Sequence, residues 1–232
     1  MGDPFQSKPE VAPEMPPGPG SMDHPAFSPW LARGVEDVYY QREAQLGLWT
    51  ILGGIAVGAL VTQMQNVASQ VQAGRWSVAL YFLATVLIIA NAWVQTAWGT
   101  LVIRWRLCVA MSLLHLFGGL ALCLHSLQVT NPPGWMFAVA LDVLVSVLIQ
   151  FYIARSGAWA VFSPAHIARL KAVVWTQGAF IGTALAAGLL LLRYPGPVHE
   201  TVWGVVAFLL AGLALWLQDR GMEAERAALG IP

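Results

Sequence analysis

Six apolar stretches, each long enough to cross a bilayer, constrain this chain more than any other feature of its sequence. They lie near residues 46–66, 78–102, 105–127, 135–155, 171–193 and 199–217. A helix needs about 20 mostly apolar residues to cross a hydrocarbon core of ~30 Å. Only 10% of the residues are charged, well below the roughly 25% of an ordinary soluble domain. The sequence therefore predicts an all-α membrane protein, a six-transmembrane-helix bundle, and excludes a water-soluble fold.

The segments outside these stretches predict four regions. Residues 1–29 hold eight of the 14 prolines, which predicts a disordered cytoplasmic tail. Residues 30–45 follow a Ser-Pro helix start and are interpreted as an interfacial amphipathic helix, with an ordinary solvated helix as the alternative. Residues 46–220 form the six-span domain, and residues 221–232 a short cytoplasmic C-terminal tail. Because only a few residues around Arg104 join spans two and three, we expect those spans to form a tight antiparallel hairpin.

Positive charges are distributed unequally between the two sides of the predicted bundle. An even number of spans puts both termini on one side of the membrane. That side carries Lys8, Arg33, Arg42, Arg104, Arg106, Arg155, Arg169, Lys171, Arg220 and Arg226. The opposite side carries only Arg75 and Arg193. Cytoplasmic loops are enriched in Lys and Arg, so we expect cytoplasmic N and C termini and an integral protein of the plasma (inner) membrane.

Asp142 is the one acidic residue deep inside a predicted span, since Glu200 stands at the outer start of the sixth. An ionised carboxylate without a partner at that depth would cost about 2.5–3.5 kcal/mol or more. Asp142 must therefore be paired, protonated or exposed to water. Ser146 and Gln150 follow at four-residue spacing, which places all three on one face of the fourth span.

Spans two and three carry polar groups at a similar depth. Asn91 and Gln95 lie four residues apart on span two, and His115 lies on a seam of small and polar residues on span three. If these faces converge with Asp142, a carboxylate, an imidazole and an amide meet in a low dielectric, where they could hold a proton or bind a cation. Hydrogen bonding across helix interfaces with a purely structural role is the alternative.

Two pairs of glycines follow the small-xxx-small pattern of close helix packing. Gly54 and Gly58 lie in span one, and Gly178 and Gly182 in span five. Such faces could form a homo-oligomer, bind a different subunit or pack the monomer.

No metalloprotease, Cys-x-x-Cys or phosphate-loop motif occurs in the sequence, so it favours a protein that is not an enzyme. The sequence does not identify a cofactor. His115 or His125 could ligate haem, a pigment or a metal. His125 could also share a metal with His199 and Glu200 at the outer rim, although ordinary surface residues are the alternative. The zero net charge and pI near 7.0 exclude the basic surface of a nucleic-acid binder.

The sequence thus supports two hypotheses of different classes. The first is a channel or transporter for a cation, a proton or a small polar solute, acting in the bilayer as a homo-oligomer. Its site comprises Asn91, Gln95, His115, Asp142, Ser146 and Gln150. The alternative is a non-catalytic accessory or scaffolding subunit of a larger membrane complex, either energy-converting or pigment-bearing, which binds other membrane subunits through the glycine faces.

Overall fold

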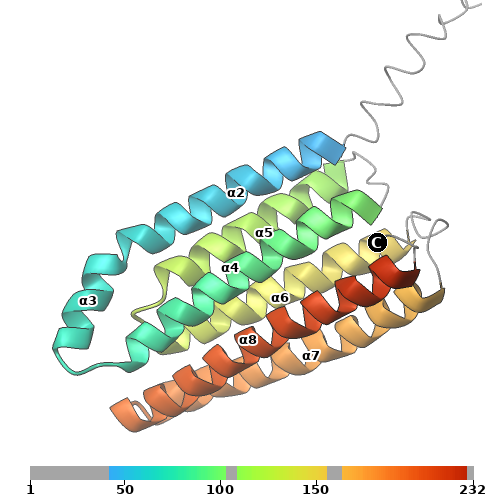
Figure 1. Cartoon of the computed structure of the whole chain (residues 1–232). Coiled ribbons are helices and arrows are strands. Elements are labelled where there is room, and N and C mark those ends of the chain that lie inside the picture. Colours follow the sequence, from blue (N-terminus) through green and yellow to red (C-terminus); the bar gives the residue numbers. More distant parts are fainter. Residues whose placement is uncertain (1–41, 103–108, 156–163, 229–232) are drawn as a thin grey trace, which may run out of the picture. The chain divides into compact units, whose positions relative to one another are not determined.

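The computed structural model describes residues 42–102, 109–155 and 164–228, which all belong to one compact unit spanning residues 38–232. Its regular elements are α2 (Arg42–Thr62), α3 (Met64–Gln72), α4 (Ser77–Val102), α5 (Val109–Leu127), α6 (Pro132–Arg155), α7 (Pro164–Arg193) and α8 (Pro197–Ala228) (Figure 1). Six spans among them are long and apolar enough to cross a membrane. The predicted all-helical six-span fold is confirmed. The tail at 1–29 and most of the interfacial helix at 30–45 lie outside the described residues.

The first and last spans run longer than predicted. The first covers Leu46–Gln72 because α3 continues α2 beyond a short break, where the Gln63 amide donates to the Leu60 carbonyl oxygen at 3.0 Å. The last covers Pro197–Ala224, and α8 itself continues to Ala228. Polar residues at these ends therefore extend the helices where hydropathy alone predicted loops or a tail.

Proline and glycine account for several of the helix boundaries. Pro132, Pro164 and Pro197 each begin a helix, since a proline at the first position fixes φ and lacks only an amide that would have no helical partner. Gly74 ends α3 with a φ of +89°, a conformation that glycine adopts at little cost. The amides of Gly74 and Arg75 then donate to the carbonyl oxygens of Val71 and Gln70, both at 2.9 Å, forming a Schellman turn.

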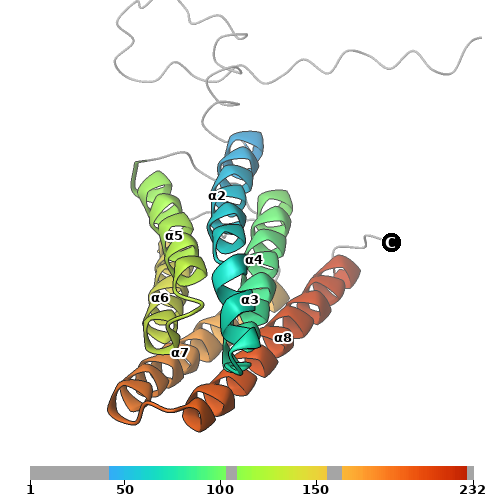
Figure 2. The ribbon, with the colours of Figure 1, turned by 90° about the vertical axis from the view of Figure 1, so that its left-hand side faces the viewer.

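The helices pack in an order that differs from their order in the chain. α5 packs between α2 and α6, and α7 packs on the other side of α6. α8 packs mainly on α4, and α4 also packs on α2. Figure 2 views the bundle from the end that carries residues 73–76, 128–131 and 194–196, which we call the turn end. At the opposite, terminal end, α2 begins and α8 ends (Figure 1).

The expected tight hairpin of spans two and three is wrong. α5 packs mainly on α2 and α6 and has only sparse contacts with α4. The physical reason is a pair of buried glycines on α5 that let α2 approach closely. A Cβ atom built at Gly119 would lie 2.6 Å from Leu52 Cδ2, and one at Gly118 would lie 3.3 Å from the Trp49 ring.

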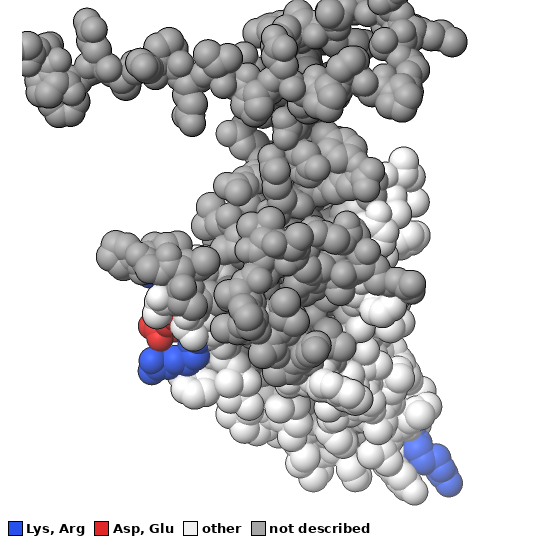
Figure 3. All heavy atoms as spheres, turned by 90° about the vertical axis from the view of Figure 1, so that its right-hand side faces the viewer, with Lys and Arg blue, Asp and Glu red and all other residues white. Residues whose placement is uncertain are grey.

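Large apolar side chains cover the outside of the bundle. Each span contributes exposed ones: Ile51, Val86, Leu120, Leu148, Leu189 and Leu209 are each more than 40% exposed. Among the described residues visible in Figure 3, few are Lys, Arg, Asp or Glu. Contiguous apolar surface of this extent suits contact with hydrocarbon rather than water. The protein is therefore an integral membrane protein.

The basic residues divide between the two ends as the sequence predicted. Arg75 and Arg193 lie at the turn end. Arg42, Arg155, Arg169, Lys171, Arg220 and Arg226 lie on helix segments towards the terminal end. Lys8, Arg33, Arg104 and Arg106 lie outside the described residues.

Replacing Gly119 with alanine is expected to lower the free energy of unfolding by about 1–3 kcal/mol. The new methyl group would overlap Leu52, which is only 6% exposed and has little room to move. Leu52→Ala should remove the overlap, so the double variant should lose less stability than the two single variants added together. Unfolding of each variant in mixed micelles would measure these values.

Gly54→Ala is the matched control, because a Cβ atom there meets nothing within 4 Å. Alanine in a helix interior is favoured over glycine by roughly 0.5–1 kcal/mol, so this variant should be at least as stable as the unmodified protein. Equal losses for the Gly119 and Gly54 variants would contradict the proposed α2–α5 packing.

Candidate polar site within the bundle

Asp142 and His125 form a buried acid–imidazole pair between α6 and α5. Asp142 lies in the middle of the span Pro132–Tyr152 and is 8% exposed, while His125 lies near the end of α5 and is fully buried. His125 Nδ1 is 3.9 Å from Asp142 Oδ2. This separation is too long for a hydrogen bond but close enough for strong electrostatic interaction in a low dielectric.

The imidazole of His125 is left without hydrogen bonds in the part of the chain that the structure describes. Neither Nδ1 nor Nε2 has a partner. The nearest aromatic neighbour given by the structure is Trp135, whose ring centroid is 6.4 Å away. A buried polar atom without a partner costs about 1–3 kcal/mol, so it calls for an explanation. A bridging water molecule, or a small rotation of either side chain, would complete a hydrogen bond between His125 and Asp142.

Trp135 connects this pair to a hydrogen-bonded chain on α4. Its indole Nε1 donates to Thr85 Oγ1 at 2.8 Å, and the Thr85 hydroxyl donates to the Tyr81 carbonyl oxygen at 2.8 Å. The Tyr81 ring lies 5.1 Å from that of Trp135, and its hydroxyl donates to the Glu200 carbonyl oxygen at 3.0 Å. Three side chains from α4 and α6 thus reach from the interior to the start of α8.

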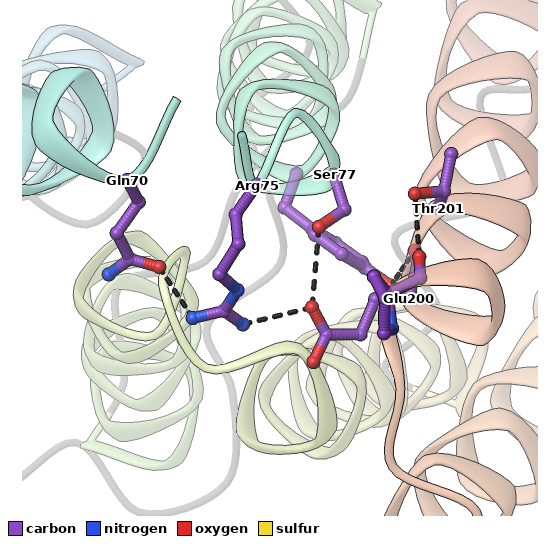
Figure 4. Close-up of polar contacts among 7 residues, drawn as sticks. Gln70, Arg75, Ser77, Glu200 and Thr201 are labelled. Carbon is purple, nitrogen blue, oxygen red and sulfur yellow. Dashed lines mark hydrogen bonds and ion pairs between the residues drawn. The ribbon is translucent and has the colours of Figure 1, made fainter. Parts of the chain in front are cut away.

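An ion pair lies above this chain at the turn end (Figure 4). Arg75 Nη2 is 2.9 Å from Glu200 Oε2, and Arg75 Nη1 donates to Gln70 Oε1 at 2.7 Å. The Ser77 hydroxyl donates to the same Glu200 oxygen at 3.3 Å. The Schellman turn at Gly74 positions Arg75 for these contacts, which join α3, α4 and α8.

The Arg75–Glu200 pair is expected to contribute at most about 1 kcal/mol, since the Arg75 side chain is 40% exposed. A double-mutant cycle with Arg75→Gln and Glu200→Gln, measured by unfolding in micelles, would give the coupling energy. Raising the salt concentration should reduce it, because salt screens exposed charges. The exposed pair of Arg220 and Glu223 on α8 is the control and should show a smaller coupling.

His115 is placed against α2. It is 1% exposed, and its ring packs edge-on against Trp49 at 5.5 Å. His115 Nδ1 is 2.7 Å from the Met111 carbonyl oxygen; because a carbonyl only accepts, Nδ1 carries the proton. The sequence predicted that His115 lies close to Asp142. In the structure the histidine that contacts Asp142 is His125, at 3.9 Å.

The other predicted polar residues are half-buried on α4 and α6: Asn91, Gln95, Ser146 and Gln150. Asn91 Oδ1 and Gln150 Oε1 are buried and lack hydrogen-bond partners among the described residues. Gln177 Oε1 on α7 shares this property, although the sequence gave no reason to single it out. These oxygens are unused acceptors, and convergence of their residues with Asp142 remains a prediction.

Sequence reasoning missed the role of α4 near the turn end. Ser77, Tyr81 and Thr85 recur at four-residue spacing, which places three hydroxyl groups on one helix face. That spacing could have predicted the shared face. The hydrogen bond between Trp135 and Thr85 could not be predicted in this way, because the two residues are 50 positions apart.

The four predicted packing glycines face outward. Gly54, Gly58, Gly178 and Gly182 are all exposed, and a Cβ atom at any of them would meet no described atom within 4 Å. Glycines elsewhere make the close approaches between helices: Gly118 and Gly119 against α2, Gly188 against Phe137, and Gly204 against Leu80. Among the described residues, these four glycines therefore make no close approach between helices.

The metal site considered for His125, His199 and Glu200 is not assembled. His125 is buried rather than at the rim, the Glu200 carboxylate is bound to Arg75, and the His199 ring stacks on Tyr194 at 6.3 Å. Within residues 42–102, 109–155 and 164–228, no group of three or more His, Cys, Asp or Glu side chains could hold a metal ion. Comparisons of the chain with protein-family models, with curated proteins and with solved structures found no match.

Proposed function

We propose that this protein is a small channel or transporter that moves protons, or a solute coupled to protons, and that Asp142 and His125 form its proton-binding site. The observation that carries the proposal is the buried pair itself: a carboxylate within a span, 3.9 Å from an imidazole whose ring nitrogens have no hydrogen-bond partner among the described residues. Ionisable residues inside membranes are costly and commonly mark proton or ion pathways.

The pair has the chemistry that a proton relay requires. Histidine exchanges its proton near neutral pH more readily than other side chains. When protonated Asp142 transfers its proton to His125 Nδ1, a neutral pair becomes an ion pair with no change in net charge. Both states avoid an isolated charge in the bilayer. Starting from the ion pair, a proton that binds Asp142 from one side while His125 releases its proton to the other regenerates the neutral pair, so a proton crosses the site without leaving an isolated charge.

The test is proton flux by the whole protein in phosphatidylcholine vesicles with a trapped pH-sensitive dye. A potassium diffusion potential set by valinomycin drives protons inward. We expect acidification of the lumen faster than in protein-free vesicles. Equal rates with and without protein, in the presence and absence of candidate cations, would overturn the proposal.

Both termini are proposed to face the cytoplasm. The support is the excess of Lys and Arg towards the terminal end over the turn end, which carries Arg75 and Arg193. A fluorescent reporter fused to the C-terminus should be active only if that end is cytoplasmic, whereas a periplasmic phosphatase fused there should be inactive. The reverse pattern would place the turn end inside.

A second candidate function is that of an accessory subunit in a larger membrane complex. It is favoured by the outward-facing glycines on α2 and α7, whose surroundings within the described chain are empty. Glycine faces allow close backbone approach of another helix. Native mass spectrometry after gentle extraction should then show the 25.1 kDa chain together with other polypeptides, whereas the transport proposal expects simple multiples of its mass.

Gly54→Leu and Gly182→Leu should release those partners, because a larger side chain would separate the two helices. Ala110→Leu is the matched control, since Ala110 is also exposed in a span but lies outside the glycine faces. Loss of partners in all three variants, or in none, would count against an accessory role of these faces.

A further inference from the structure

A cavity of about 80 Å³ lies among α4, α6, α7 and α8. It is separate from the His125–Asp142 pair, although Trp135 contributes to the boundary of both. α7 packs mainly on α6 and α8 mainly on α4, so these two consecutive helices make few contacts with each other. The cavity occupies the space between them.

The walls of the cavity offer no obvious hydrogen bond to a ligand. They are almost entirely apolar. The Thr183 hydroxyl donates to the Ala179 carbonyl oxygen at 2.9 Å, and the Trp135 indole donates to Thr85. A polar occupant would lose hydrogen bonds to water on entering, whereas a hydrocarbon would lose none.

Alanines determine the width of this space. Ala184 and Ala187 line it from α7, and Ala207 and Ala211 line it from α8. All four alanines belong to the candidate spans Trp175–Arg193 and Pro197–Ala224. The cavity thus lies at the depth of lipid tails, and Thr183, one of its lining residues, is exposed on the outer surface of α7.

The size of the cavity selects among apolar occupants. A helix with its side chains is about 10 Å across, too wide for this space. A benzene ring occupies an engineered cavity of roughly 150 Å³, about twice the volume found here. At roughly 30 Å³ for a group the size of a water molecule, the space holds about three such groups, so a short run of methylenes from one unbranched hydrocarbon chain fits both the volume and the apolar walls.

We propose that this cavity, the α7–α8 groove, holds a short segment of one phospholipid acyl chain, and that this phospholipid exchanges more slowly than the lipids around the bundle. The bound segment fills the space that the four alanines leave between α7 and α8. The headgroup of this phospholipid stays at the membrane surface. This site is independent of the proton-binding site proposed above.

The test uses the full-length protein in phosphatidylcholine vesicles that contain a small fraction of phosphatidylcholine with a diazirine in one acyl chain. After equilibration the vesicles are fused with an excess of unlabelled lipid and illuminated at increasing times. Adducts are mapped by mass spectrometry. Adducts on groove residues such as Phe180 and Leu210 should persist several-fold longer than adducts on the outward-facing Leu189 and Leu209. Equal decay at both sets would overturn the proposal.

Two variants sharpen the result. Ala207→Leu should fill the groove and reduce the persistent adducts several-fold, whereas Ala186→Leu, at an exposed position of α7, should leave them unchanged. Unchanged adducts in Ala207→Leu would overturn the proposal. A photoreactive leucine analogue at Leu210 gives an independent readout in the otherwise unmodified chain. It should form adducts with lipid, and adducts with a second protein copy instead would show that another chain occupies the groove.

Discussion

Vesicles containing the Asp142→Asn variant are expected to take up protons no faster than protein-free vesicles. Asparagine has nearly the shape of aspartate and retains a hydrogen-bonding side chain, but it cannot bind and release a proton. The variant should therefore fold and insert normally. Its circular dichroism and its elution in size-exclusion chromatography should match those of the unmodified protein, so that a loss of flux reports chemistry rather than misfolding.

His125 should behave as part of the same unit. If the proton passes between the two side chains, His125→Asn should abolish flux alone, and the double variant should lose nothing further, because residues acting in one step are not additive. Glu223→Gln is the matched control: its carboxylate is 58% exposed on α8, and flux should be unchanged. Normal flux in Asp142→Asn would show that this carboxyl group is structural.

Replacing Trp135 with alanine is expected to lower the free energy of unfolding by about 3–5 kcal/mol, the range for removing a buried aromatic side chain. The ring is only 2% exposed and contacts Tyr81 at 5.1 Å. In a bilayer this cost arises chiefly from lost packing, since lipid tails are as apolar as the protein interior. Urea or dodecyl sulfate unfolding in mixed micelles would measure it.

Trp135→Phe separates packing from hydrogen bonding at this position. It keeps a ring but removes the indole group that donates to Thr85, which costs about 0.5–1.5 kcal/mol for the hydrogen bond. The Thr85 hydroxyl still donates to Tyr81. Trp76→Ala is the control, because Trp76 is 67% exposed and little packing is lost. If Trp135→Ala were no less stable than Trp76→Ala, the role of Trp135 in the interior would be wrong.

The sequence predicted the number and approximate limits of the spans because length and hydropathy alone decide whether a helix can cross hydrocarbon. It also identified Asp142, since an acidic residue inside a span is rare and costly. The hydropathy of a span and the presence of an acidic residue within it can be read from one segment alone. Neither depends on how one helix is rotated against another.

The rotation and the neighbours of each helix could not be predicted in the same way. A soluble helix reveals its buried face by an apolar stripe, but a span is apolar all round, so the pattern did not show that α5 turns Gly119 towards α2. For the same reason the sequence considered His115 rather than His125 beside Asp142. The four-residue spacing of Gly54 and Gly58 likewise could not show that they face outward, while the adjacent Gly118 and Gly119 lie buried against α2.

The pairing of α4 with α8 has a consequence for the biogenesis of the protein. Chains are inserted from the N-terminus as they are synthesised, so α4 enters the membrane before its most extensive neighbour, α8, which is synthesised after all the other described helices. Until then Leu80, which contacts Gly204 of α8, must face lipid or an insertion factor. Packing of the second span is therefore completed only after α8 has been synthesised, and a nascent chain that stops before residue 197 leaves that face uncovered for quality-control proteases to recognise.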